Sequence, residues 1–428
     1  MPPLSAPDVP SPSPSTLSFR QSRVLTGRYI FQESEILGVG ASATVYKGLD
    51  KQECRNVAIK MYKVDPDDPS GLDAFVQSVT VFEALSQGTG HVARHSLGAS
   101  SDTSAKDIDA IQEEIAQVCA NPDSAMVRAD SAAMGRADSA GIVRYKTDGF
   151  LRHLDVRCCF VKLLDYSKTE GGKPGLDPAD DVLFLVFELG DESLEETITS
   201  LSGQGSTLPL KELRKIQWTL VSMVWGLHAA GYVHLDIKPK NVMRFGTGSS
   251  AQWKLIDLDG AVPSGSTQPV RSLTFTPEYM PPELASALLS AVSSPVGKVA
   301  TIVTSRLMDV WSVGMCMLEV VFLQPVLAPF YKEWNQETGN DMKYFRWLSD
   351  MDSEPIISGD MMSHIVAIHP DMADLLADML NREPRQRCSI GRCLTHKWFD
   401  PVREKTMAEI KRASVKGHVL PTKVCSTM

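Results

Sequence analysis

The spacing of apolar residues changes along this chain, and that change constrains the fold more than any other feature. From Tyr29 to Tyr62, short β-type runs alternate with Gly and Asp turns, whereas from Leu208 onward the apolar spacing is helical and the runs are long. We therefore expect an α+β fold in which a small β-rich lobe precedes a larger helical lobe. The 428 residues exceed an ordinary domain of about 100–200 residues, which suits two lobes with inserts and tails.

Composition marks the segments that do not belong to either lobe. The first residues are rich in Pro and Ser and too poor in apolar side chains to fold alone, and an internal stretch is rich in Ala, Ser, Asp and Gly. The predicted boundaries are a disordered tail over residues 1–28, a β-rich lobe over 29–188 with an insert over 88–155, a helical lobe over 189–400 with a smaller insert near 286–306, and a tail over 401–428.

Charge and hydropathy exclude several classes of partner. The formal net charge of -9 gives no general attraction to phosphate backbones, so nucleic acids and anionic membranes are not expected partners. The most apolar run, Val310–Leu323, is interrupted by Ser312 and Glu319, and we identify neither a membrane span nor a signal peptide. The eight cysteines contain no C-x-x-C pair, which favours reduced thiols. We expect an intracellular, cytoplasmic protein.

A glycine-rich turn between two β-type runs is followed by a strand lysine. Leu37–Gly48 has the pattern strand, turn, strand, so backbone N–H groups near Gly38 and Gly40 can approach phosphate groups without a Cβ in the way. On the next strand, alternation directs Ala58 and Lys60 to the same face. Ala58 would pack against a bound nucleotide, and Lys60 would supply a positive charge to it.

One short loop, His234–Asn241, offers a carboxylate, an ammonium and an amide at spacings suited to phosphoryl transfer. It resembles the catalytic loop of the eukaryotic protein kinase family. The resemblance implies that Asp236 orients the substrate hydroxyl and accepts its proton, and that Asn241 holds a magnesium ion. It also implies that Lys238 touches the transferred phosphate, a feature typical of Ser/Thr kinases.

Two apolar segments are similar to nucleotide-binding parts of that family. Phe184–Gly190 resembles the link between lobes that hydrogen-bonds adenine through its backbone, and Phe187 would restrict the pocket behind the adenine. Trp253–Gly260 resembles the strand and turn that bind metal, with Asp257 as the magnesium ligand and Leu258 where the family usually has Phe.

Later motifs follow in the order of the family. Thr276–Glu283 resembles the segment that receives the peptide, and the Thr276 hydroxyl should bridge toward the catalytic loop. Asp309–Gly314 looks like the start of the buried helix that supports this loop, and Arg387 matches the partner of Glu283. The match implies a bilobal protein-kinase-like domain over residues 29–400, with Mg-ATP bound between its lobes.

The resemblance therefore implies a protein kinase that uses ATP and Mg2+ to phosphorylate Ser or Thr hydroxyls of protein substrates. The implied catalytic residues are Asp236, Lys238 and Lys60, the implied magnesium ligands are Asn241 and Asp257, and the implied nucleotide-binding residues are Leu37, Gly38, Val39, Gly40, Ala41, Val45, Ala58, Lys60, Glu188, Gly190 and Met243. The alternative is a pseudokinase that binds nucleotide and acts as an interaction scaffold.

The helix expected over Gly71–Gln87 departs from the family, in which a Glu pairs with the strand lysine and an apolar residue follows four positions later. One register places Ser78 at the Glu position and Phe82 at the apolar one, which completes an apolar face. The other uses Glu83, but then Gln87 would be buried. We favour the register with Ser78.

Two further departures concern charge. Leu235 replaces the Arg that pairs with an activation-loop phosphate in many family members, so activity should not require such a phosphate. Asp259 stands where the family has Gly. We hypothesise that Asp259 substitutes for the missing helix Glu, by pairing with Lys60 or by joining the metal ligands.

Overall fold

The computed structural model describes residues 22–65, 68–87, 156–248, 251–293, 299–338 and 341–415. They form two compact units. The small unit comprises the described residues up to Gly71 together with Leu164–Leu189, and the large unit comprises the described residues of Leu72–Leu163 and those from Gly190 onward. The insert predicted over residues 88–155 lies outside the described residues.

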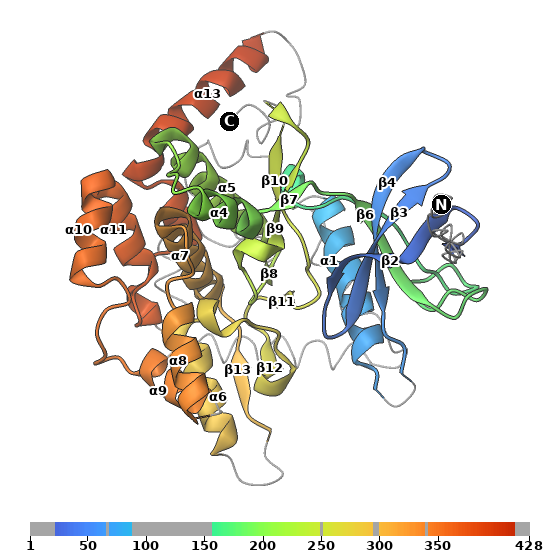
Figure 1. The fold of residues 1–428 in the computed structure, drawn as a ribbon, viewed down its shortest axis with the longest axis horizontal. Helices are drawn as coiled ribbons and strands as arrows, with labels where there is room; N and C mark the ends of the chain where they lie inside the picture. Colours follow the sequence, from blue (N-terminus) through green and yellow to red (C-terminus); the bar gives the residue numbers. More distant parts are fainter. Residues whose placement is uncertain are drawn as a thin grey trace, which may run out of the picture. The chain divides into compact units, whose positions relative to one another are not determined.

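The small unit is built on one six-stranded sheet (Figure 1). In spatial order its strands are β1 (Ser22–Leu25), β2 (Tyr29–Val39), β3 (Ala43–Asp50), β4 (Arg55–Tyr62), β6 (Leu183–Glu188) and β5 (Leu163–Tyr166). Neighbouring strands from β1 through β6 pair antiparallel, and β6 enters the sheet from much later in the chain. This arrangement confirms the β-rich unit expected from the short apolar runs.

Alternation along β4 separates a core face from a functional face. Val57 and Ile59 are fully buried and belong to the core cluster of this unit. The other members of the cluster are Leu25, Tyr29, Phe31, Phe184 and Val186. Because successive strand residues point to opposite faces, Ala58 and Lys60 lie together on the face away from this core, as the sequence predicted.

The first strand corrects the predicted tail. Residues up to 28 were expected to be disordered, but β1 pairs with β2 through a tight turn, with Leu25 opposite Tyr29. Leu25 is buried in the core cluster, and Thr26 and Gly27 adopt positive φ in the turn. The Pro/Ser-rich composition ends before these residues, and the ordering comes from a partner strand that local composition does not reveal.

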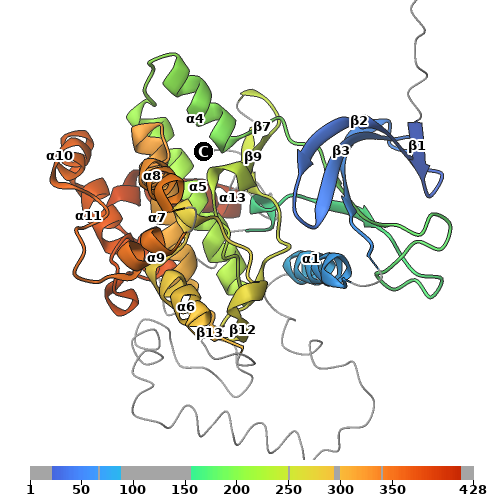
Figure 2. The ribbon, with the colours of Figure 1, turned by 60° about the horizontal axis from the view of Figure 1, so that its bottom comes forward.

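The large unit is mainly helical (Figure 2). Its helices are α1 (Ser70–Gln87), α4 (Leu194–Gly203), α5 (Leu210–Ala229), α6 (Pro282–Val292), α7 (Arg306–Phe322), α8 (Ala328–Thr338), α9 (Met342–Ser349), α10 (Gly359–Ile368), α11 (Pro370–Met379), α12 (Ile390–Leu394) and α13 (Asp400–Val415). α7 is buried along most of its length and forms the centre of the unit. No helix of the described residues is both long enough and apolar enough to cross a membrane.

Short strands of the large unit form three small sheets. They are β10–β9–β7, β11–β8 and β12–β13, built from β7 (Glu192–Ser193), β8 (Tyr232–Val233), β9 (Val242–Phe245), β10 (Gln252–Leu255), β11 (Val262–Pro263), β12 (Thr267–Pro269) and β13 (Thr301–Val303). The insert predicted near 286–306 includes the end of α6, which continues through Val292, and β13, and α7 begins at Arg306.

The register of α1 agrees with the one favoured from the sequence. Ser78 is completely buried, whereas Glu83 is exposed. The apolar face that accompanies Ser78 consists of Phe75, Val79, Phe82 and Leu85, all of which are buried. Ser78 therefore occupies the inward position that the family gives to Glu.

The segment after residue 400 is not simply a tail. Residues up to Val415 form α13, in which Thr406 is buried and the guanidinium of Arg403 donates to the Leu394 carbonyl at 3.3 Å. The polar sequence of this helix shows little apolar periodicity, which is why the pattern did not predict it. Residues 416–428 lie outside the described part of the chain.

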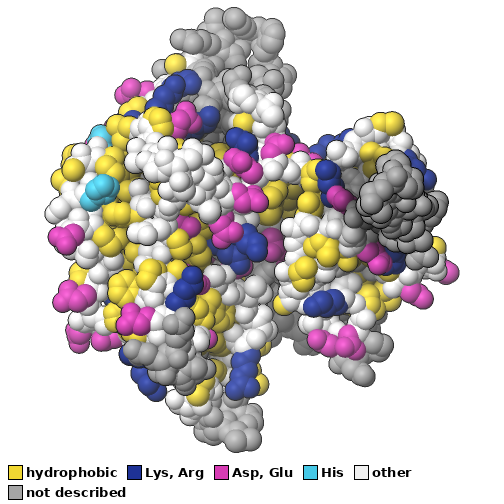
Figure 3. Space-filling view, in the orientation of Figure 1, with side chains coloured by type: hydrophobic (Ala, Val, Ile, Leu, Met, Phe, Trp, Pro, Cys, Tyr) yellow, Lys and Arg dark blue, Asp and Glu magenta, His cyan; other side chains and the backbone are white. Residues whose placement is uncertain are grey.

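Charged side chains of both signs are distributed over the surface. On the face that Figure 3 shows, Lys and Arg side chains alternate with Asp and Glu side chains, and apolar side chains lie between them.

Six cysteines of the described residues, Cys54, Cys158, Cys159, Cys316, Cys388 and Cys393, are free thiols.

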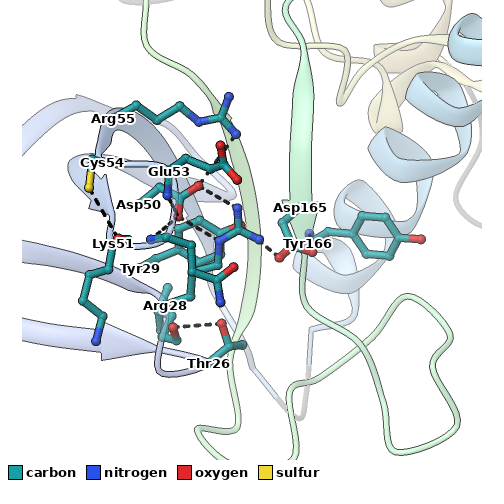
Figure 4. A network of polar contacts seen from close by, with 12 residues as sticks. Thr26, Arg28, Tyr29, Asp50, Lys51, Glu53, Cys54, Arg55, Asp165 and Tyr166 are labelled. Carbon is teal, nitrogen blue, oxygen red and sulfur yellow. Dashed lines mark hydrogen bonds and ion pairs between the residues drawn. The ribbon is translucent and has the colours of Figure 1, made fainter.

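A buried carboxylate fixes the β3–β4 turn of the small unit (Figure 4). Asp50, fully buried, accepts two hydrogen bonds from the Arg28 guanidinium at 2.8 and 2.7 Å. It also accepts the backbone N–H groups of Gln52 and Glu53, at 3.1 and 3.4 Å. The hydrogen bond from Arg28 lowers the pKa of Asp50 to about 2. These contacts join β1–β2 to the turn that follows β3.

Candidate functional site

In the small unit, Lys60 lies on a strand that is paired on both sides. Lys60 pairs with Val45 on β3 and with Leu185 on β6 through the strand register. Its side chain is only 9% exposed, and its Nζ lies 5.4 Å from the centroid of the Tyr62 ring. A cation held inside a sheet is suited to a multiply charged anion such as a nucleotide phosphate.

The glycine-rich turn joins β2 to β3 and presents open backbone. The N–H of Gly40 donates to the Ala43 carbonyl at 2.8 Å, which closes the turn. A Cβ placed on Gly38 would meet no atom within 4 Å, and Val39 next to it is 69% exposed. Lys63 stabilises the turn by donating to the Ala41 carbonyl at 2.6 Å. No neighbouring atom therefore crowds Gly38, whereas the Gly40 N–H is already bonded within the turn.

The catalytic-loop residues of the large unit form a closed set of hydrogen bonds. The Lys238 ammonium donates to Asp236 Oδ2 and to Thr276 Oγ1, both at 2.7 Å. The Thr276 hydroxyl in turn donates to Asp236 Oδ1 at 2.7 Å. The bridge expected for Thr276 is thus present. It fixes both oxygens of a carboxylate that is only 7% exposed.

The backbone of this loop is held by a buried carboxylate on α7. Asp309 accepts the N–H groups of His234 and Leu235 and contacts His228 Nε2, each at 2.8 Å. Leu235 has φ of 69°, a left-handed conformation that is strained for a side chain of this kind. Burial by itself would raise the pKa of Asp309, but the hydrogen bond from His228 and the further N–H donors hold it below its usual range.

Two predicted magnesium ligands lie at the ends of neighbouring strands. Asn241 precedes β9, Asp257 follows β10, and the Ile256 N–H donates to the Asn241 carbonyl at 2.9 Å. The Asn241 side chain donates its amide nitrogen to the Asp236 carbonyl at 2.9 Å, which leaves its amide oxygen as the group for a cation. Asp257 is exposed and has φ of 59°.

An amide oxygen and a carboxylate are ligands that Mg2+ accepts together with phosphate oxygens and water, so these residues fit the ion. The described residues contain no group of three or more His, Cys, Asp or Glu that could hold a metal by itself. Leu258, at the position where the family has Phe, is completely buried and anchors the turn.

The turn after Asp257 is tied to α1 by two side chains. Ser78 Oγ donates to Asp259 Oδ1 at 2.5 Å, and Gln77 Nε2 donates to the Ala261 carbonyl at 2.5 Å. The sequence had singled out both Ser78 and Asp259, but not the hydrogen bond between them, and it gave no role to Gln77. A carboxylate, that of Asp259, therefore lies beside Ser78, the α1 position at which the family has Glu.

The peptide-receiving segment is anchored at two points. The Arg387 guanidinium donates to both oxygens of Glu283, at 2.9 and 3.1 Å, as predicted. The Tyr279 hydroxyl donates to Glu319 Oε2 at 2.6 Å, a contact that the sequence did not reveal. Burial raises the pKa of Glu319 to about 7, with some offset from the hydrogen bond of Tyr279. In the sequence, Glu319 stood out only as an interruption of an apolar run.

The remaining predicted nucleotide-binding residues belong to different units. Glu188 ends β6 in the small unit, whereas Gly190 and Met243 lie in the large unit. A Cβ at Gly190 would overlap the Met243 side chain, which would have to shift to admit any other residue at this position. The predicted set divides into Leu37, Gly38, Val39, Gly40, Ala41, Val45, Ala58, Lys60 and Glu188 in the small unit, and Gly190, Asp236, Lys238, Asn241, Met243 and Asp257 in the large unit.

Comparisons with known proteins agree with this geometry. The family model described as "Protein kinase domain" matches residues 150–399, more than half of the chain. Cyclin-dependent kinase B2-2 of Arabidopsis thaliana is 26% identical over 243 residues, which cover 53% of this chain and 70% of that protein. Serine/threonine-protein kinase 17A of Oryctolagus cuniculus is 24% identical over 247 residues, which cover 56% of this chain and 54% of that protein.

A solved structure is similar over a longer part of the chain. The CAK complex from Chaetomium thermophilum bound to ATP-gamma-S contains a chain that matches with a TM-score of 0.51 and 19% identity, covering 87% of this chain and 92% of that one. The family match begins at residue 150, so the glycine-rich turn and Lys60 lie before it and rest on their own geometry.

Proposed function

The chain belongs to the protein kinase family and has its bilobal α+β fold, and from this we propose that it transfers the γ-phosphate of ATP to Ser or Thr hydroxyls of protein substrates. The observation that supports the proposal most strongly is the closed set of hydrogen bonds among Asp236, Lys238 and Thr276. It holds a carboxylate and an ammonium together next to the segment that resembles a peptide-binding site.

Each member of this set has a distinct task in the proposed reaction. Asp236 orients the incoming hydroxyl and accepts its proton, because a carboxylate in hydrogen-bond reach is a suitable base. Lys238 places a positive charge where the transferred phosphoryl group gains negative charge. Thr276 joins the two and fixes their rotamers, since its hydroxyl accepts from Lys238 and donates to Asp236. Positioning and electrostatics, not covalent chemistry, supply the rate.

The proposed cofactors are ATP and Mg2+. Asn241 and Asp257 would hold the metal, which when bound neutralises charge on the phosphate oxygens. Lys60 and the open backbone at Gly38 are suited to the phosphates. The bound ATP-gamma-S named for the Chaetomium thermophilum structure adds support for ATP, and Lys238 supports Ser/Thr as acceptors.

A second candidate is a nucleotide-binding scaffold without transfer activity. It is favoured by Ser78, which occupies the inward position on α1 where the family has a carboxylate. Asp259, bonded to Ser78, restores a carboxylate to the same place. The presence of the catalytic Asp, Lys and Asn together supports the enzyme over the scaffold.

The deciding experiment measures transfer of radiolabelled phosphate from Mg-ATP to generic Ser/Thr and Tyr peptides. We expect transfer to Ser/Thr peptides, and a loss of about 10²–10⁴ in kcat for Asp236→Asn, roughly 3–5 kcal/mol of barrier. Nucleotide affinity should be retained in this variant. Asp180→Asn, at an exposed residue, is the matched control. Nucleotide binding without transfer would favour the scaffold, and transfer to Tyr alone would contradict the acceptor class.

A further inference from the structure

The segment between the metal-binding turn and the peptide-receiving segment, residues 261–275, is called here the activation segment. It is paired with a strand that comes from after α6. β12 and β13 run antiparallel, with Thr267 opposite Val303 and Gln268 opposite Ile302, and Figures 1 and 2 show them side by side. The activation segment is thus ordered by a strand of the same chain.

Backbone hydrogen bonds extend this pairing beyond the two short strands. The Gly265 N–H donates to the Thr304 carbonyl, and the Thr304 N–H donates to the Ser266 carbonyl, both at 2.9 Å. At the other end, the Val270 N–H donates to the Ala300 carbonyl at 2.9 Å. The pairing therefore covers the activation segment from residue 265 to residue 270.

The side chain of Thr304 adds a second layer of contacts. Its hydroxyl donates to the Pro263 carbonyl at 2.9 Å and lies 3.2 Å from the Ser266 carbonyl. Thr304 is 1% exposed, so its hydroxyl depends on protein acceptors, and the Pro263 carbonyl also accepts from the Ser266 hydroxyl at 2.6 Å. Pro263 belongs to β11, which pairs with β8 directly before the catalytic loop. Thr304 therefore fixes the start of the activation segment beside that loop.

The same short stretch of chain also supports the catalytic loop. Ser305 follows Thr304 and caps α7, accepting the Leu307 N–H at 3.2 Å. In the first turn of α7, Asp309 holds the backbone of His234 and Leu235. Residues 304–309 thus contact both parts of the site that must be aligned for phosphoryl transfer.

Leu235 cannot form an ion pair with a phosphate on the activation segment. It is an apolar residue, 3% exposed, whose N–H is bonded to Asp309. A phosphate on the activation segment would find no guanidinium at this position, whereas strand pairing needs no modification. A phosphate paired with a guanidinium and a strand paired with the segment have the same effect, because each orders a segment that would otherwise be mobile.

We propose that β13 and Thr304 form a built-in clamp that orders the activation segment without phosphorylation, with Thr304 as a positioning residue for the peptide-receiving segment. The part of this inference that concerns catalysis rests on the proposed function. The clamp itself is a structural claim about residues 262–270 and can be tested in a chain with or without activity.

The test compares amide hydrogen exchange in three forms of the full-length, phosphatase-treated chain. Thr304→Val removes the hydroxyl but keeps a β-branched side chain of similar size. Thr301→Val makes the same substitution at an exposed residue of the same strand. Thr304→Val removes the hydroxyl that joins the residue after β13 to the Pro263 carbonyl, which then keeps only donors within the activation segment, the hydroxyl and N–H of Ser266. Because the side-chain bond between the two segments is lost, we expect exchange over residues 262–270 to become about tenfold faster. Thr301→Val should exchange like the wild type.

Kinetic measurements and a conservative variant distinguish a positioning role of Thr304 from a general loss of folded structure. Thr304→Ser keeps the hydroxyl and should retain protection, and Thr304→Ala is a second variant if valine fails to fold. In Thr304→Val, kcat/KM for the peptide should fall while KM for ATP stays unchanged.

The possible failures are distinguishable. Absence of transfer in every form would overturn the proposed function, while the exchange result would still test the clamp. Equal exchange in Thr304→Val and wild type, or much faster exchange of the wild type after phosphatase treatment, would overturn the clamp even in an active enzyme.

Discussion

Asp50 in the small unit and Asp309 in the large unit are fully buried carboxylates that use the same chemistry for different purposes. Each accepts two backbone N–H groups, and in addition Asp50 contacts the guanidinium groups of Arg28 and Arg55, at 2.7 and 3.7 Å, whereas Asp309 contacts His228. The amides bonded to Asp50 follow it by two and three positions, whereas those bonded to Asp309 precede it by 75 and 74 positions. Asp50 shapes its own turn, but Asp309 holds a distant loop, the one that leads into Asp236 and Lys238.

The segments that the two carboxylates stabilise carry different residues. Each segment contains a non-glycine residue with positive φ, Cys54 at 47° in the turn after Asp50 and Leu235 at 69° in the loop bonded to Asp309. Strained backbone of this kind persists only where the surroundings over-determine it. Only the second segment is followed by predicted catalytic residues, Asp236 and Lys238. We therefore expect loss of Asp309 to affect activity and loss of Asp50 to affect stability.

Among substitutions of the buried carboxylates, Asp309→Asn should have the largest effect on kcat. Asn offers one acceptor oxygen and one NH2 group, so at least one of the three N–H donors around it would face another donor. The loop would relax and displace Asp236, and a shift of about 1 Å at reacting groups can cost about 10²-fold in rate. We expect kcat to fall by about 10²–10³-fold, measured with saturating Mg-ATP and peptide. Retention of most of the wild-type kcat would show that the buried carboxylate is not needed for alignment.

Asp50→Asn should leave kcat of the folded enzyme unchanged and reduce stability by on the order of 2 kcal/mol, because Asn lacks the negative charge and offers only one acceptor oxygen to the Arg28 guanidinium and the two amides. Denaturant unfolding at pH 7 checks this. The pKa of Asp50 is lowered to about 2 in the folded state. Its contribution is therefore present above the ordinary Asp pKa and is lost as the pH falls toward 2. The gap between variant and wild type should narrow in acid. A fall in kcat like that of Asp309→Asn would remove the distinction between the two sites.

The difference between the local contacts of Asp50 and the long-range contacts of Asp309 also explains what the sequence could predict. Contacts between close neighbours were accessible, such as the shared face of Ala58 and Lys60 or the inward register of Ser78, because strand and helix periods determine them. The catalytic loop could be recognised from the sequence because its carboxylate, ammonium and amide lie within six residues.

Long-range contacts were accessible only where the family supplied them. The pairing of Glu283 with Arg387 was predicted by resemblance, but the bonds from Thr304 to Pro263 and from Tyr279 to Glu319 were not, since no local pattern links residues about 40 positions apart. The strand β1 and helix α13 were missed for a related reason. Their order depends on partners elsewhere in the fold, which composition does not report.

A third buried carboxylate sharpens the comparison, because its partner is a hydroxyl. Glu319, 3% exposed, accepts from Tyr279, and its pKa is raised to about 7 by burial, with Glu195 and Glu278 adding repulsion. A folded pKa above the ordinary value of 4.5 means that the folded state binds more protons than the unfolded state between these two values. The contribution of Glu319 to stability is therefore fully present below about pH 4.5 and is lost as the pH rises to about 7, opposite to the behaviour of Asp50.

Glu319→Gln should remove this pH dependence, because the amide accepts from Tyr279 without ionising. We expect the variant to gain about 1–2 kcal/mol relative to wild type between pH 5 and pH 8, measured as the difference in unfolding free energy at each pH. Glu212→Gln, at an exposed position, controls for the loss of a negative charge and should show no such gain. If the variant and the wild type differed by the same amount at both pH values, Glu319 would be ionised throughout the range. A carboxylate bonded to a hydroxyl would then behave like one bonded to amides and a cation, and the identity of the donor would not decide the charge state of these buried groups.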